Sequence, residues 1–205
     1  MFNTREKKER SLGVKLFLKA SRCNSPKCAT IRRPQPPGAH GKARRRGMSE
    51  YGQQLKEKQK IRYSYGLRES QMKRIFTEAS RNPGVTGETI LQLLERRLDN
   101  VVFRLGLALS RSVARQLVGH GHIMVNGRRV TIPSFCVKIG DKISIRPQSK
   151  ENLIFKDLGA TMKKYQAPAW LKLDNEKYEG EVVALPKEFE DSFDVNMVVD
   201  FYSKQ

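Results

Sequence analysis

Apolar residues recur at helical spacing through the first half of the chain and predict three helices. Ser49 suits a helix N-cap, so we expect the first helix to begin there and to reach about residue 63. A second helix is expected over residues 68–80, and the Asn-Pro-Gly sequence at 82–84 should end it. A third is expected to start near Gly87 and to run to residue 94 or beyond. These amphipathic helices predict a helical domain.

A further short helix is expected near the middle of the chain. Gly106 should end the helical stretch before it, and Ser110 should cap a helix over residues 111–118. A glycine at 119 or 121 can close this helix with a positive φ angle. The apolar residues of the helix should face inward and its arginines outward.

Alternating apolar and polar residues then predict a mainly antiparallel sheet. A strand at residues 123–125 leads into the Asn-Gly dipeptide at 126–127, which is a strong signal for a two-residue hairpin turn. The returning strand is expected over residues 128–132, and residues 137–145 predict another turn followed by another strand. Together with the short helix, these strands predict a small α/β domain.

Positive charge is concentrated toward the N-terminus. The chain has 205 residues, with 40 Lys and Arg against 21 Asp and Glu, which gives a formal net charge of +19. Residues 1–82 hold 22 basic and 6 acidic residues, whereas residues 148–205 hold 8 and 11. Such a field attracts nucleic acid, an anionic membrane or an acidic protein. No run of about 18 apolar residues is present, and the most basic stretch, residues 32–46, has no apolar face for a membrane surface. Nucleic acid is therefore the expected partner.

Prolines and glycines interrupt the most basic stretch, residues 32–46, and exclude a regular helix or a central strand. We expect this stretch to be extended and poor in internal contacts, and we expect its three arginines at 44–46 to become ordered only on a polyanion such as RNA. The alternative is a flexible, solubilising basic tail.

Several segments resemble known RNA-binding proteins. Residues 94–106 (LERRLDNVVFRLG), 110–118 and 123–127 are similar to the small RNA-binding domain named after bacterial ribosomal small-subunit protein four. That domain also occurs in some tRNA synthetases, pseudouridine synthases and heat-shock proteins, so the rest of the chain is more informative. Residues 33–41 (RPQPPGAHG), 49–60 (SEYGQQLKEKQK), 168–171 (PAWL) and 201–204 (FYSK) resemble the ribosomal protein family itself. The resemblance extends from about Leu12 to the end of the chain.

This resemblance implies an α+β fold, in which a helical domain carries an inserted small α/β RNA-binding domain and an irregular basic N-terminal extension. The expected parts are the extension at residues 1–47, the helical domain at 48–94 completed by the C-terminal tail at 192–205, the small RNA-binding domain at 95–160, and a connecting segment at 161–191.

The resemblance also implies a function. Family members are structural components of the small ribosomal subunit that bind small-subunit rRNA directly, nucleate assembly of its 5′ domain, and lie near the mRNA entry path and the decoding region. The implied partners are this rRNA, neighbouring small-subunit proteins and, as a further candidate, mRNA, with one copy per ribosome and no membrane. The absence of a secretory signal and the odd number of cysteines agree with a cytoplasmic location in the ribosome.

The expected RNA-binding residues are basic, polar, aromatic or turn-forming residues of the extension, the helices and the hairpin. They are Arg32, Arg33, Pro37, Gly38, His40, Gly41, Lys42, Arg44, Arg45, Arg46, Ser49, Tyr51, Gln54, Lys56, Lys58, Gln59, Lys60, Arg62, Tyr65, Arg68, Lys73, Arg97, Arg104, Ser110, Arg111, Arg115, Gln116, His120, His122, Asn126, Arg128 and Arg129. We interpret them as phosphate grips and stacking surfaces that recognise the shape of folded RNA. For each aromatic residue, packing in the core is the alternative.

Two cysteines raise the question of a structural metal. Zinc needs four ligands, and some members of the resembling family hold a metal with two cysteine pairs. Here Glu6 and Glu9 stand where one pair would be. We expect Cys23 and Cys28 to be free thiols and the chain to have no cofactor, with a zinc site of two cysteines and two glutamates as the alternative.

The remaining cysteine and two neighbouring histidines carry no metal signal. Cys136 is expected to face the core. If His120 and His122 were on a strand, they would share one face. We expect both to form hydrogen bonds to RNA, with exposed turn residues as the alternative.

We expect no enzymatic activity. An RNA-modifying enzyme with the same small domain would need a catalytic domain, and residues 148–205 are too short for one. Their carboxylates, such as Glu188, Glu190, Asp191 and Asp194, are typical of a solvated surface. The sequence has no phosphate-binding loop, dinucleotide fingerprint or nucleophile elbow. The alternative function is an RNA chaperone or stress protein, while a DNA-binding regulator lacks a clear recognition helix.

Overall fold

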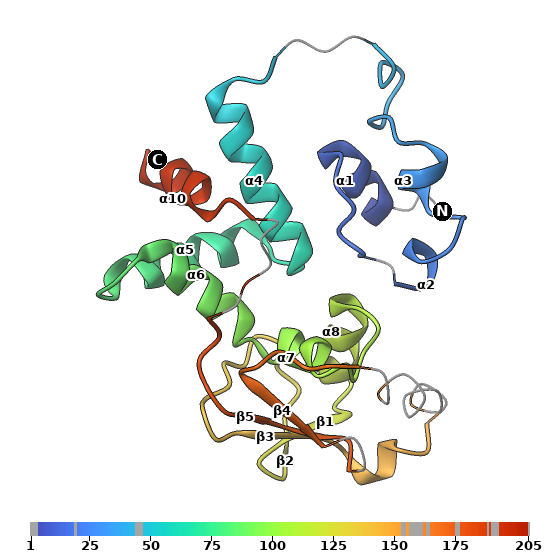
Figure 1. Cartoon of the computed structure of the whole chain (residues 1–205), viewed down its shortest axis with the longest axis vertical. Coiled ribbons are helices and arrows are strands. Elements are labelled where there is room, and N and C mark those ends of the chain that lie inside the picture. The colour runs from blue at the N-terminus through green and yellow to red at the C-terminus, as the bar shows by residue number, and fades with distance from the viewer. Residues whose placement is uncertain are drawn as a thin grey trace. The chain divides into compact units, whose positions relative to one another are not determined.

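The computed structural model describes residues 4–18, 20–43, 47–152, 155, 162, 165–174, 177–187, 189 and 193–204. The chain forms two compact units, one made of Met1–Ile90 with Glu190–Gln205 and the other of Leu91–Phe189. Figure 1 traces the elements of both. The predictions for Arg44, Arg45 and Arg46, and for the carboxylates of Glu188, Glu190 and Asp191, lie outside the described residues.

The described part of the first unit is helical. Its helices are α1 (Thr4–Leu12), α2 (Ala20–Cys23), α3 (Ala29–Arg32), α4 (Glu50–Ser64), α5 (Glu69–Arg81), the first part of α6 (Thr86–Glu95) and α10 (Val195–Ser203). Ser49 caps α4 as predicted, because its Oγ accepts a hydrogen bond from the Gly52 amide at 3.2 Å. Helix α5 starts after Arg68 and ends at its C-cap Asn82, and α6 starts one residue before the predicted Gly87. The three predicted helices are thus confirmed.

Helix α10, near the C-terminus, packs against α4 and α5 of the same unit (Figure 1). The carboxylate of Glu69 joins these helices. Its Oε1 accepts hydrogen bonds from Tyr202 Oη and from Lys58 Nζ, each at 2.8 Å, and its Oε2 accepts one from Arg62 at 3.1 Å. Burial and the hydrogen bond to Glu69 raise the pKa of Tyr202, so its hydroxyl stays protonated and remains a donor. Lys58 also lies 4.4 Å from the centre of the Phe201 ring, which explains how a buried lysine is accommodated.

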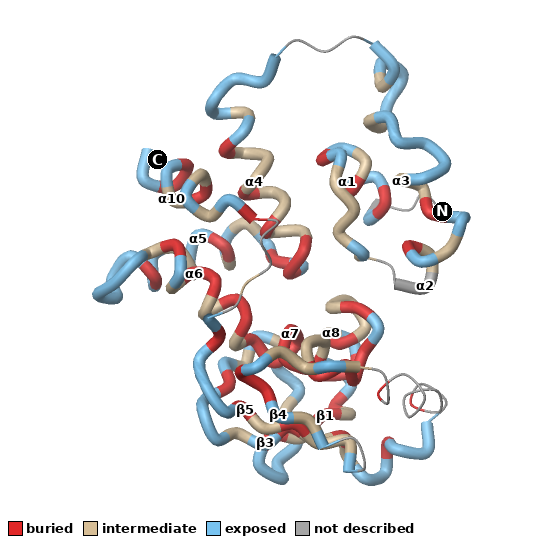
Figure 2. Tube along the Cα trace, viewed as in Figure 1, coloured by how far each residue is buried: buried red, intermediate tan, exposed pale blue. Residues whose placement is uncertain are grey.

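The described part of the second unit is a five-stranded antiparallel sheet with helices on one side (Figure 1). Its elements are α7 (Leu98–Arg104), α8 (Arg111–Gly119), β1 (Ile123–Val125), β2 (Arg128–Arg129), β3 (Lys142–Ile145), the 3₁₀ turn η1 (Pro147–Ser149), β4 (Leu171–Asp174) and β5 (Glu179–Val182). The strand order is β2-β1-β3-β5-β4. Apolar residues of α7, α8 and the strands form one core, which Figure 2 shows as the buried part of this unit. The predicted α+β fold class is confirmed.

The joint between α7 and α8 follows from its local sequence. Gly106 has a φ of +74°, and a Cβ at this position would clash with the ring of Tyr165. The Tyr165 hydroxyl donates to the carbonyl oxygen of Arg104 at 2.9 Å, so the ring closes over the end of α7. Ser110 then caps α8, since its Oγ accepts from the Val113 amide at 3.4 Å. The predicted helix end, cap and second helix are confirmed.

The predicted hairpin is confirmed, although its second strand is shorter than expected. Asn126 and Gly127 both have positive φ angles, +50° and +77°, as a type I′ turn requires. The Asn126 side chain also donates to Asp141 Oδ1 at 2.8 Å and accepts from the Lys142 amide at 2.9 Å, which links the turn to β3. The returning strand covers only Arg128–Arg129, not residues 128–132.

The prediction that Cys136 faces the core is wrong. Cys136 is exposed, whereas its neighbour Val137 is fully buried. The backbone here pairs with the segment before α7, because the Val137 amide donates to the carbonyl of Arg96 at 2.9 Å. Side chains alternate across such a pairing, so Val137 faces the core and Cys136 faces solvent.

Candidate nucleic-acid interface

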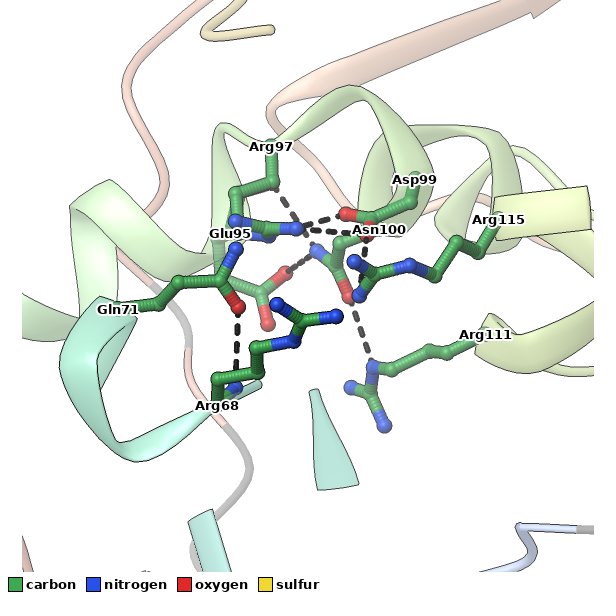
Figure 3. A network of polar contacts seen from close by, with 8 residues as sticks. All are labelled: Arg68, Gln71, Glu95, Arg97, Asp99, Asn100, Arg111 and Arg115. Atoms are coloured by element: carbon green, nitrogen blue, oxygen red, sulfur yellow. Dashed lines mark hydrogen bonds and ion pairs between the residues drawn. The ribbon is translucent and has the colours of Figure 1, made fainter. Parts of the chain in front are cut away.

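Buried acidic and amide side chains hold a cluster of arginines at the start of the second unit (Figure 3). Glu95 is 1% exposed, and its two carboxylate oxygens accept hydrogen bonds from Nε and Nη2 of Arg104, both at 3.0 Å. The Asn100 Nδ2 donates to the carbonyl oxygen of Glu95 at 3.0 Å and to its Oε2 at 2.9 Å. The position of Arg104 is therefore fixed by groups that are shielded from water.

A second buried carboxylate, Asp99, binds two more arginines. Arg97 binds it in a bidentate way, with Nε 3.1 Å from Oδ1 and Nη2 2.8 Å from Oδ2. Arg115 on α8 places Nη1 3.9 Å from Asp99 Oδ2. Arg111, one turn earlier, donates from Nε to Asn100 Oδ1 at 2.8 Å (Figure 3). It also lies 4.9 Å from the centre of the Phe103 ring.

These arginines differ in their access to a ligand. The side chain of Arg97 is 7% exposed and that of Arg104 is 18% exposed, whereas that of Arg115 is 39% exposed and Arg111 is half-buried. Arg97 and Arg104 thus act mainly as supports in the folded chain, and Arg111 and Arg115 are presented by α8 at a fixed spacing. Guanidinium groups held in this way suit phosphate oxygens, because little conformational freedom is lost on binding.

The acidic and amide residues Glu95, Asp99 and Asn100 are absent from the predicted site, which named only the arginines around them. Their signal in the sequence is the interleaving of carboxylates with arginines in residues 95–104. Without the fold, that pattern is equally typical of an exposed helix with surface ion pairs.

His120 and His122, the predicted residues at the end of α8, lie on the turn between α8 and β1. His120 is the C-cap of α8, and His122 precedes β1, so neither histidine lies on a strand. His120 is exposed and His122 is half-buried. Ser110 is buried as the cap of α8, whereas the remaining predicted residues of this region, Gln116, Asn126, Arg128 and Arg129, are exposed.

The basic extension is more ordered internally than predicted. Arg10 Nε donates to the carbonyl oxygens of Arg33 at 2.7 Å and Gln35 at 3.0 Å. Gly38 has a φ of +111°, and the Gly41 amide donates to its carbonyl at 3.3 Å, which makes a turn where an extended chain was expected. Figure 2 shows this segment as mostly exposed. Of the predicted residues here, Arg32, Arg33, Gly38, His40 and Lys42 are exposed, and Pro37 and Gly41 are half-buried.

The predicted residues along α4 and α5 divide by burial. Gln54, Lys58 and Tyr65 are buried, and Gln54 donates to Glu50 Oε1 at 3.1 Å. The half-buried residues are Lys56, Gln59, Lys60 and Arg62, and the exposed residues are Ser49, Tyr51, Arg68 and Lys73. The residues of this set that a ligand can reach in the described structure are therefore the exposed and half-buried ones.

The cysteines and glutamates near the N-terminus do not fit a metal site. Glu9 is fully buried, and its Oε1 accepts from the amides of Leu16 and Leu18 at 3.0 and 3.2 Å. Its Oε2 lies 4.0 Å from Cys23 Sγ, whereas Cys28 Sγ lies 2.9 Å from Thr30 Oγ1. Glu9 Oε1 is thus occupied by backbone amides, and the two thiols contact different groups, Cys23 the Glu9 carboxylate and Cys28 the Thr30 hydroxyl. No group of three or more metal-ligating side chains occurs among the described residues.

No helix within the described part of the chain is long and apolar enough to cross a membrane.

Comparison with known proteins identifies the family. Residues 2–95 match the model of the ribosomal protein S4/S9 N-terminal domain, and residues 96–143 match that of the S4 domain. The small ribosomal subunit protein uS4 of Pelotomaculum thermopropionicum is 52% identical over 196 residues, which cover 94% of this chain and 93% of the relative. The uS4 protein of Thermus thermophilus is 50% identical over 194 residues, again 94% of this chain and 93% of the relative. The chain therefore belongs to the uS4 family of small ribosomal subunit proteins.

Proposed function

We propose that this protein is a structural component of the small ribosomal subunit that binds small-subunit rRNA directly. The observation that carries the proposal is the pair Arg111 and Arg115, which buried side chains hold on one short helix of a domain that matches the S4 domain. Fixed guanidinium groups grip phosphates at a set separation, so they recognise the shape of folded RNA more than its sequence. As a member of this family, the chain is a ribosomal protein and not an enzyme, and it acts in the ribosome in the cytoplasm.

We further propose that binding nucleates assembly of the 5′ domain of the rRNA, and that one copy lies near the mRNA entry path and the decoding region. Neighbouring small-subunit proteins are the expected protein partners, and mRNA is a further candidate ligand. The support for these points is the resemblance of residues 33–41, 49–60 and 201–204 to the family, together with the net charge of +19.

A salt series tests direct binding to the phosphate backbone. The logarithm of the affinity for the 5′-domain rRNA should fall linearly with the logarithm of the salt concentration, by about 0.7–0.9 for each phosphate neutralised. The series is measured by filter binding with the full-length protein. The variant Lys204→Gln serves as control, because Lys204 lies outside the predicted set and pairs with Glu50, and its slope should equal that of the unchanged protein. An affinity that does not depend on salt would contradict the proposal.

A further inference from the structure

Two histidines and two arginines surround the turn between α8 and β1. The rings of His120 and His122 are nearly parallel, with 11° between their planes and 6.2 Å between their centres. The guanidinium of Arg129 donates to the His120 carbonyl at 3.4 Å and covers Gly121, where a Cβ would clash with it. The Arg146 amide donates to the carbonyl of His122 at 2.8 Å, so Arg146 is anchored beside the second histidine. Four groups that are cationic or can become so therefore converge on one turn.

The ring of His122 is held in one orientation. Its Nδ1 lies 3.0 Å from the Oγ of Ser149, a residue that is only 4% exposed. The ring of Phe155 meets it edge-on, with 6.2 Å between the centres and 78° between the planes. With Nδ1 engaged by Ser149, Nε2 is the ring nitrogen left to face a ligand.

In the free protein, the surroundings of His122 oppose its protonation. Burial lowers the pKa of His122, and the positive charges of His120, Arg129 and Arg146 lower it further. Among the residues that the structure describes, the charged groups that act on this ring come from the ends of α8 and β3 and from β2, and all of them are basic. A negatively charged ligand among these groups would raise the pKa of His122, because it would stabilise the protonated imidazole.

We propose that His120, His122, Arg129 and Arg146 form a clamp for a backbone phosphate of RNA, and that the clamp takes up a proton when the phosphate binds. This inference rests on the proposed function. It adds Arg146 to the predicted interface, and it makes this part of the interface sensitive to pH.

The direction of the pH effect follows from linkage. The pKa of His122 is lowered in the free protein, and a bound phosphate would raise it. The extra affinity is therefore complete below the pKa of the free protein and is lost as the pH rises through the pKa of the complex. For one proton, the affinity changes by up to about tenfold for each pH unit between the pKa of His122 in the free protein and its pKa in the complex. The phosphodiesters of RNA stay ionised across this range, so the protein is the source of the effect.

The test measures binding of the full-length protein to the 5′-domain rRNA at constant salt, at about pH 6 and about pH 8. The unchanged protein should bind at least about fivefold more tightly at the lower pH. The double variant His120→Gln/His122→Gln should lose most of this difference, and Arg146→Gln should weaken binding at both pH values. Lys172→Gln is the control, because Lys172 is exposed on β4 of the same unit, lies outside the predicted interface and should leave the pH dependence intact.

Proton uptake by the unchanged protein gives a second readout that needs no variant. Titration calorimetry in buffers of different ionisation enthalpy should show net proton uptake on RNA binding near neutral pH. Tight, selective binding without a pH dependence or proton uptake would overturn the clamp and leave the proposed function standing. Retention of the pH dependence in the double variant would also overturn the clamp. Failure to bind this rRNA at either pH would instead overturn the proposed function.

Discussion

Replacing Glu95 with glutamine is expected to destabilise the second unit by about 3 kcal/mol, because the change removes the charge that pairs with a largely buried arginine. The side chain of Glu95 is 1% exposed, and it accepts two hydrogen bonds from Arg104 and one from Asn100. Trp170 is the single tryptophan of the chain and is buried in the core of the same unit. Its fluorescence during urea unfolding therefore reports the stability of this unit directly.

Two comparisons make this test specific for the buried pair. Glu50→Gln breaks an ion pair of similar length, 2.9 Å to Lys204, in the first unit. Both side chains are mainly exposed, so the unfolding midpoint followed by circular dichroism, which reports both units, should hardly change. Combining Glu95→Gln with Arg104→Gln should cost less than the sum of the two single changes, because the second removes the charge that the first leaves unpaired. Additive effects, or a loss no larger than that of Glu50→Gln, would contradict the role of Glu95 as a buried anchor.

The double variant Arg111→Gln/Arg115→Gln is expected to lower the affinity for the 5′-domain rRNA by about 10- to 100-fold, because each arginine contributes a charge-assisted contact to phosphate. The slope of the salt series should also fall by about one to two, since one phosphate contact is lost with each charge. Glutamine is preferred to glutamate at position 115, because a new carboxylate beside Asp99 would add repulsion and destabilise the fold.

The matched control for this pair is Lys172→Gln. Lys172 is exposed on β4 of the same unit and lies outside the predicted interface, so its removal tests the loss of charge alone. Circular dichroism should confirm that all variants remain folded. An equal loss of affinity in Lys172→Gln would mean that RNA responds to total charge and not to the arginines on α8.

Local sequence patterns predicted the elements whose cause is local. The caps at Ser49 and Ser110 and the hairpin at residues 126–127 depend on a few neighbouring side chains, and all three are present in the structure. Strands β4 and β5 were not predicted, because their stability comes from distant pairing. Ile143 in β3 lies opposite Gly180 in β5, and nothing near either residue in the sequence indicates this.

The sequence indicated some of the residues that the structure brings together in the candidate site. Charge and the family resemblance pointed to the arginines on α7 and α8. They did not indicate which of these arginines are buried supports and which are exposed to a ligand. That division depends on which carboxylates are buried, and the burial of Glu95 and Asp99 follows from the packing of the whole unit. Of the histidine cluster, Arg146 was missed for a similar reason, since it reaches the turn only through the pairing of β1 with β3.

Competition binding tests the central claim most directly. The full-length protein is bound to the 5′ domain of small-subunit rRNA, and tRNA and a scrambled RNA of equal length are added as competitors. Selective recognition of folded rRNA predicts a preference of about a thousandfold or more for the 5′ domain. Equal affinity for all three RNAs would contradict it and would favour a general RNA chaperone that uses the same small domain.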